Sequence, residues 1–143
     1  MTTPNGPRRG EIDTRTVIQH LLDAVPDVIA VYQFGSAARG ESRADSDIDV
    51  AVLARAPIHA QRRFEIEQAL AVRLHRDVDL VDLQEASTVM RMQVLATGHC
   101  LESTHDRDRR LFEMYAYSDY ARLNEERRDI IKGVTARGSV YGR

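Results

Sequence analysis

Apolar positions along the chain alternate between helical and extended spacing. Apolar residues three and four positions apart predict helices over residues 13–25, 59–75 and 87–96, and a longer helix over 106–132. Mostly apolar runs between them predict strands over 28–34, 48–53 and 77–83, and the segment HCLES at 99–103 is a candidate short edge strand. Both alternating faces of VIAVYQF at 28–34 are largely apolar, so this strand is expected to be central and covered on both sides.

The length of 143 residues indicates one folded domain. Residues 1–10 contain two Pro and two Gly and are expected to be flexible. Residues 133–143 contain three Gly without apolar periodicity, so we expect a flexible tail there. The folded domain is therefore predicted to cover residues 11–132.

The amino-acid composition argues against some classes of binding partner. The chain has 20 Lys and Arg against 22 Asp and Glu, so no overall field attracts a nucleic acid or an anionic membrane surface. No apolar run approaches the roughly 20 residues that a membrane span needs. The single cysteine, Cys100, excludes an internal disulfide framework. We expect a cytoplasmic protein that binds neither membranes nor, directly, nucleic acids.

The segment YQFGSAARGESRADSDIDVAV, residues 32–52, places two acids where a sheet normally avoids them. Alternation along a strand puts Asp47 and Asp49 on the same face, about 6–7 Å apart. Two carboxylates on a partly buried face repel each other unless one takes a proton or a cation lies between them. Magnesium commonly binds one or two carboxylates together with substrate phosphates, so the pattern favours a Mg²⁺ site for a phosphorylated ligand.

A phosphate-binding turn and a third acid complete the candidate site. Gly35 directly follows a buried strand and permits close approach of a ligand, while Ser36 is a good N-cap whose neighbouring N–H groups suit a phosphate. In DVDLVDL, Asp79 is the interior carboxylate, although Asp77 and Asp82 remain alternatives for the third acid. Three acids beside such a turn suit a two-metal phosphoryl or nucleotidyl transfer.

Each of these residues also has a purely structural explanation. Asp47 could be a turn residue and Ser36 a simple helix cap. Asp79 could be a solvated residue on an edge strand. Arg39 and Arg43 lie between the motifs and could neutralise phosphates, but solvated loop arginines are the default expectation. The matched spacing of the Gly-Ser pair and the two acids is what favours a ligand site.

Gly35-Ser36, then ten residues, then Asp47-Ile48-Asp49 resembles the GS-x10-DxD signature of the DNA polymerase β-like nucleotidyltransferases. The short chain and FGSAARGESRADSDIDVAVL more narrowly resemble the minimal nucleotidyltransferase (MNT) antitoxins that are paired with HEPN ribonuclease toxins. The resemblance covers about residues 15–102. It implies an α/β (α+β) fold, with a small mixed sheet flanked by helices and a C-terminal helix.

The same resemblance implies roles for individual residues. Gly35 and Ser36 would contact the triphosphate of ATP, Asp47 and Asp49 would bind Mg²⁺, and Asp79 would be the third carboxylate, both metal-binding and catalytic. The implied activity is transfer of AMP from ATP to a tyrosine of a HEPN toxin, within a hetero-oligomer. Two alternatives stay open, namely an antitoxin that neutralises the toxin by binding alone and a stand-alone enzyme that modifies a small molecule.

Overall fold

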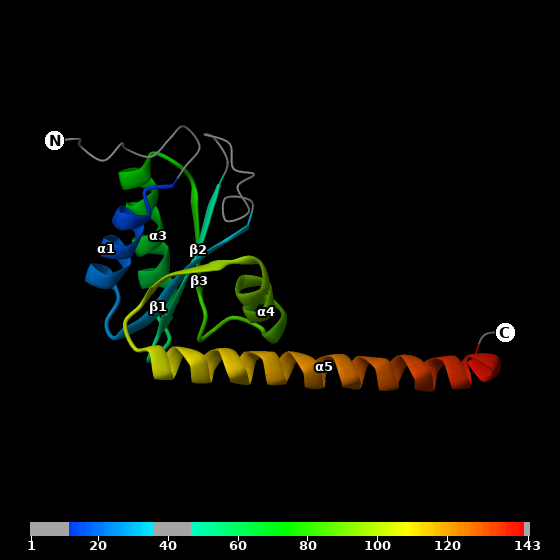
Figure 1. Cartoon of the computed structure of the whole chain (residues 1–143). Helices are drawn as coiled ribbons and strands as arrows, with labels where there is room; N and C mark the ends of the chain where they lie inside the picture. The colour runs from blue at the N-terminus through cyan, green and yellow to red at the C-terminus, as the bar shows by residue number, and fades with distance from the viewer. Residues whose placement is uncertain (1–11, 36–46, 142–143) are drawn as a thin grey trace.

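A computed structural model describes residues 12–35 and 47–141, with side chains described as far as residue 133. Its centre is a four-stranded mixed sheet with the strand order β3-β2-β1-β4 (Figure 1). Strand β1 is antiparallel to β2 and β4, whereas β2 and β3 are parallel. The predicted mixed sheet flanked by helices is confirmed. The strands are β1 (Val28–Phe34), β2 (Ile48–Ala54), β3 (Val78–Asp82) and β4 (His99–Ser103).

Helices cover both faces of this sheet. On one face lie α1 (Thr14–Ala24) and α3 (Ala60–Leu74), and on the other lie α4 (Thr88–Thr97) and the start of α5 (Asp106–Tyr141) (Figure 1). Alternation along β2 divides the core accordingly, because Val50 and Val52 pack towards α1 and α3 while Ala51 and Leu53 pack towards α4. Every residue of β1 is buried, which confirms its predicted central position.

The predicted element boundaries hold to within one or two residues, except at the C-terminus. Capping explains the helix starts, since the side chains of Asp13, His59 and Ser87 accept backbone N–H groups at the beginnings of α1, α3 and α4. The helix predicted over 106–132 continues to Tyr141, so the expectation that residues 133–141 lack regular structure is wrong. Glycine lowers helix propensity by only about 1 kcal/mol relative to alanine, which does not prevent a long helix from continuing. The flexible segment predicted for residues 1–10 lies outside the described residues.

The first turns of α5 are fixed to the sheet. The buried Tyr32 hydroxyl of β1 donates to Glu113 Oε2 at 2.7 Å, and Arg109 Nη1 donates to the same carboxylate at 3.1 Å. Arg55, just after β2, forms an ion pair of 2.7 Å with Asp108. Burial and the Glu113 carboxylate raise the pKa of Tyr32, so this phenol keeps its proton and remains a donor.

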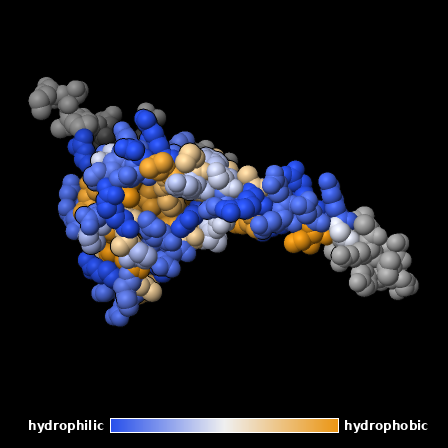
Figure 2. Space-filling model, turned by 90° about the horizontal axis from the view of Figure 1, so that it is seen from below, coloured by the Kyte–Doolittle hydropathy of each residue, from blue (hydrophilic) through white to orange (hydrophobic). Residues whose placement is uncertain are grey.

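Most of α5 extends away from the body of the molecule (Figure 1). Its described side chains are exposed from Glu125 to Lys132, and Figure 2 shows a mainly hydrophilic arm with a hydrophobic area near its far end. Ile130 and Ile131 are 64% and 63% exposed. Because these isoleucines are mostly exposed, packing against the body of this chain adds little to the stability of this part of α5. The arm is therefore available to another molecule. Within the part of the chain that the structure describes, no helix is both long and apolar enough to cross a membrane.

Candidate active site

Strand pairing brings the predicted acids of β2 and β3 together. In the parallel register, Asp49 lies opposite Asp79, and Asp47 directly precedes β2. On the other side of β2, Asp49 lies opposite Phe34, the last residue of β1. Consequently the end of β1 and the starts of β2 and β3 lie together at one end of the sheet. Asp49 is half-buried there, whereas Asp47 and Asp79 are exposed.

Gly35 closes this site from the β1 side. Its backbone has φ +78°, in the left-handed region that side chains disfavour. A Cβ atom at this position would lie 2.1 Å from Asp49 Oδ2, far inside van der Waals contact. Glycine is therefore required both by the backbone angle and by the close approach of the Asp49 carboxylate. The predicted partner of Gly35 in phosphate binding, Ser36, lies outside the described residues, as do Arg39 and Arg43.

The electrostatics of Asp49 show that the carboxylates are crowded. Burial is the largest cause that raises the pKa of Asp49 from 3.8 to about 6. The charge of Asp79, a hydrogen bond between the Asp49 and Asp79 carboxyl groups, and the charge of Asp47 raise it further. Burial and these neighbouring acids therefore disfavour the negative charge of Asp49. These crowded carboxylates therefore favour the binding of a cation.

The donor set fits a hard divalent cation. Carboxylate oxygens are the ligands that Mg²⁺ prefers, and a cation beside Asp49 would offset the burial and the neighbouring negative charges that raise the pKa of this residue. Among the described residues, no group of three or more His, Cys, Asp or Glu side chains is arranged so that it could hold a metal ion. An open set of this kind is expected where Mg²⁺ completes its coordination with substrate phosphates and water.

The two alternative third acids take other positions. Asp82, at the end of β3, is only 4% exposed, and its carboxylate accepts the backbone N–H groups of Ile58 at 2.7 Å and Gln84 at 3.0 Å. It therefore organises the connection into α3. Asp77 lies before β3, where its carbonyl accepts Ile48 N–H at 2.9 Å. Of the three acids in this segment, Asp79 is the one whose position in the strand register is opposite Asp49.

Sequence reasoning missed a pair of side chains that protect the free edge of β3. Glu67 Oε2 on α3 accepts the Leu80 backbone N–H at 2.7 Å, and Arg63 Nη1 donates to the Leu80 carbonyl at 3.0 Å. Arg63 and Glu67 are one helical turn apart and form an ion pair of 3.4 Å. Their spacing alone suggests only an ordinary surface pair on a helix. The covering of an exposed strand edge becomes visible only in the tertiary structure.

This arrangement of strands and acids agrees with comparisons to known proteins. A family model described as Polymerase beta, Nucleotidyltransferase matches residues 16–107, which include Asp47, Asp49 and Asp79. The chain belongs to this nucleotidyltransferase family.

Relatives of this nucleotidyltransferase include a curated protein from Shewanella oneidensis, named Protein adenylyltransferase MntA. It is 40% identical over 126 residues, which cover 88% of this chain and 90% of MntA. A crystal structure described as the toxin–antitoxin with AMP-PNP contains a chain that is 40% identical, with a TM-score of 0.79; the match covers 87% of this chain and 99% of that one.

A third similar structure is described as a tri-AMPylated Shewanella oneidensis HEPN toxin in complex with MNT antitoxin. The matching chain is 39% identical, with a TM-score of 0.72, and the match covers 85% of this nucleotidyltransferase and 95% of that chain. The similarity extends over nearly the whole length of each relative.

Proposed function

We propose that this nucleotidyltransferase is an antitoxin that transfers AMP from ATP to a tyrosine of a cognate HEPN ribonuclease toxin and thereby silences it. The relatives support this proposal, because they are named as a protein adenylyltransferase and as antitoxins of HEPN toxins. The observation that carries it is the pairing of Asp49 opposite Asp79 beside Gly35, which assembles the acids that a nucleotidyl transfer needs. The cytoplasmic location predicted from the sequence is part of the proposal.

In this reaction each predicted residue has a role. The oxygen of the tyrosine hydroxyl attacks the α-phosphorus of ATP, the new O–P bond forms, and the bond from the α-phosphorus to the bridging oxygen breaks, which releases pyrophosphate. Asp79 receives the phenol proton, since a base must lie within reach of the attacking hydroxyl. Gly35 and Ser36 contact the triphosphate, and only glycine at position 35 allows the Asp49 carboxylate to lie so close to the backbone.

Asp47, Asp49 and Asp79 would hold Mg²⁺. When bound, Mg²⁺ neutralises the charge on the phosphates and on the carboxylates together. The raised pKa of Asp49 supports this assignment, because burial and then the neighbouring acids disfavour its negative charge, and a cation would offset both effects. Within residues 12–35 and 47–141, the regular structure outside the sheet and its covering helices is the extended part of α5, which supports an acceptor supplied by a second protein.

Incubation of the purified chain with Mg-ATP and its cognate HEPN toxin tests the proposal. Intact-mass spectrometry of the toxin should show the addition of whole AMP units, and the ribonuclease activity of the toxin should fall in parallel. Asp47→Ala and Asp49→Ala should abolish both changes, whereas Asp23→Ala, a change of an exposed aspartate on α1, should leave them intact. If the toxin stays unmodified but is inhibited equally by these variants, the chain neutralises it by binding alone.

A further inference from the structure

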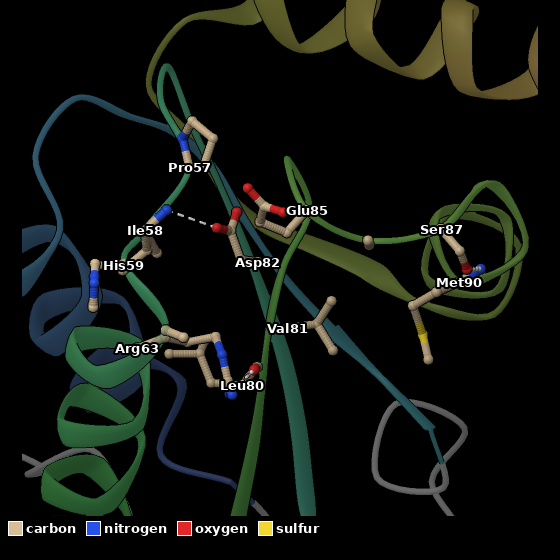
Figure 3. A pocket seen from close by; sticks show the side chains of 12 residues that line it. Pro57, Ile58, His59, Arg63, Leu80, Val81, Asp82, Glu85, Ser87 and Met90 are labelled. Carbon is tan, nitrogen blue, oxygen red and sulfur yellow. Dashed lines mark hydrogen bonds between the residues drawn. The ribbon is translucent and has the colours of Figure 1, made fainter.

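A cavity of about 790 Å³ lies over the outer edge of β3, between the start of α3 and the start of α4 (Figure 3). Pro57 and Ile58 line one side of it, Val81 lines the floor, and Met90 lines the far side (Figure 3). None of these side chains belongs to the acid cluster, which consists of Asp47, Asp49 and Asp79. The cavity is nevertheless close to that cluster, because Val81 is two residues beyond Asp79 on the same strand and so lies on the same face, about 6–7 Å away.

The order of the strands indicates which substrate approaches the site from the side of β3. Gly35 follows β1, Asp49 lies on β2 and Asp79 lies on β3, and these strands are neighbours in that order. In a nucleotidyl transfer the attacking and leaving oxygens are roughly in line across the phosphorus. If the pyrophosphate leaves on the Gly35 side, the acceptor hydroxyl must arrive from the β3 side. The cavity therefore adjoins the path of the acceptor and not the triphosphate.

Two of the charged groups around the cavity, Arg63 and Asp82, already have partners within the chain. Arg63 contacts Glu67 and the Leu80 carbonyl, and Glu67 accepts the Leu80 N–H, so a peptide cannot pair with β3 at this residue. The carboxylate of Asp82 accepts two backbone N–H groups. What the cavity offers to an incoming segment is chiefly its apolar wall, formed by Pro57, Ile58, Val81 and Met90.

We propose that this cavity anchors an apolar side chain of the toxin segment that carries the acceptor tyrosine. The inference rests on the proposed function and adds a specificity site to it. Insertion of such a side chain would hold the segment against β3 and place the nearby hydroxyl beside Asp79. Anchoring of this kind raises the effective concentration of the hydroxyl at the reacting phosphorus without any contact to ATP.

A matched pair of substitutions on α3 provides the test. Ala60 and Ala69 are both exposed alanines of this helix, but only Ala60 lines the cavity. Ala60→Phe should project into the cavity, obstruct the anchoring side chain and raise the KM for the cognate HEPN toxin by about tenfold to a hundredfold, the range expected when one buried apolar anchor is lost. Ala69→Phe should leave the KM unchanged. Ala60→Leu, which projects less far, should give an intermediate KM.

Controls separate this inference from the proposed function. The melting temperature of Ala60→Phe and its increase with Mg-ATP should match those of the wild type, because neither folding nor the nucleotide site is altered. If the wild type modifies the toxin but Ala60→Phe and Ala69→Phe have the same KM, the anchoring site is wrong and the transfer activity stands. If the wild type itself transfers no AMP to the toxin, the proposed function fails and the anchoring site fails with it.

Discussion

Asp49→Asn tests whether carboxylates are crowded at the starts of β2 and β3. In the protein without metal, burial of Asp49 and then the neighbouring Asp79 raise the pKa of Asp49 from 3.8 to about 6. Asparagine has nearly the same shape but cannot ionise. We therefore expect a folded variant that is more stable than the wild type at neutral pH in the absence of metal, and that has lost its transfer activity.

The size of the effect follows from the pKa of Asp49. The difference between 3.8 and about 6 corresponds to about 3 kcal/mol at 1.36 kcal/mol per pKa unit. The side chain is only half-buried, and screening by solvent reduces this figure to about 1–2 kcal/mol. Because the folded state has the higher pKa, this contribution to stability is present at low pH and is lost as the pH rises from about 4 through about 6.

Urea denaturation in the presence of EDTA, followed by circular dichroism between about pH 4 and about pH 7, measures the effect. The variant and the wild type share all other acids, so the difference between their free energies of unfolding isolates position 49. This difference should be small near pH 4 and should reach about 1–2 kcal/mol in favour of Asp49→Asn near pH 7.

Asp82→Asn is the matched control, at the opposite end of the neighbouring strand. The Asp82 carboxylate accepts two backbone N–H groups, and weakening these bonds should destabilise the protein by about 1–3 kcal/mol. The two Asp→Asn changes should therefore shift stability at neutral pH in opposite directions. An Asp49→Asn protein that is less stable than the wild type near pH 7, or a difference that does not vary with pH, would refute the crowding of the carboxylates.

Three further predictions concern the site and the edge of the sheet. Gly35→Ala should destabilise the protein by about 1–3 kcal/mol and abolish transfer, because its Cβ would meet Asp49 Oδ2 at a positive φ; urea denaturation and an AMP-transfer assay would show both losses. Mg-ATP at about one hundred times its Kd should stabilise the wild type by about 2.7 kcal/mol but not Asp49→Asn, and an unchanged wild-type melting temperature in a thermal-shift titration would contradict a nucleotide site. Glu67→Ala should destabilise the protein by about 1–3 kcal/mol, because it leaves the Leu80 N–H on β3 without its acceptor. The exposed strand edge should also promote self-association, which light scattering would detect. Glu65→Ala, a change of an exposed residue on the same helix, should have neither effect.

Much of this molecule could be predicted from local patterns in the chain. The apolar run at 28–34 is a central strand because both of its faces are apolar. DIDVAVL is a strand because most of it is an apolar run, and its two acids lie at the start of that run. The Gly-Ser pair and its spacing from Asp47 and Asp49 predict a ligand site, and in the structure Gly35 lies beside Asp49. These features depend on residues that are close in sequence, so their physical cause is visible there.

The third acid needed the tertiary structure. From the sequence, Asp77, Asp79 and Asp82 were all candidates, and the pairing of β2 with β3 placed Asp79 opposite Asp49 while Asp82 became a backbone acceptor. Strand register depends on which residues of distant segments are buried together, and no local pattern contains that information.

The length of α5 and the cavity beside β3 were also decided beyond the local sequence. The glycine-containing tail shows no apolar periodicity, yet α5 continues to Tyr141, because a helix already anchored through Tyr32, Arg109 and Glu113 needs no new nucleation to extend. The cavity arises where the starts of α3 and α4 flank an edge strand whose Leu80 is covered by Arg63 and Glu67. The local sequence determined where the strands and helices begin and which acids are candidates, whereas the packing of distant segments decided the extent of α5, the acid that lies opposite Asp49 and the position of the cavity.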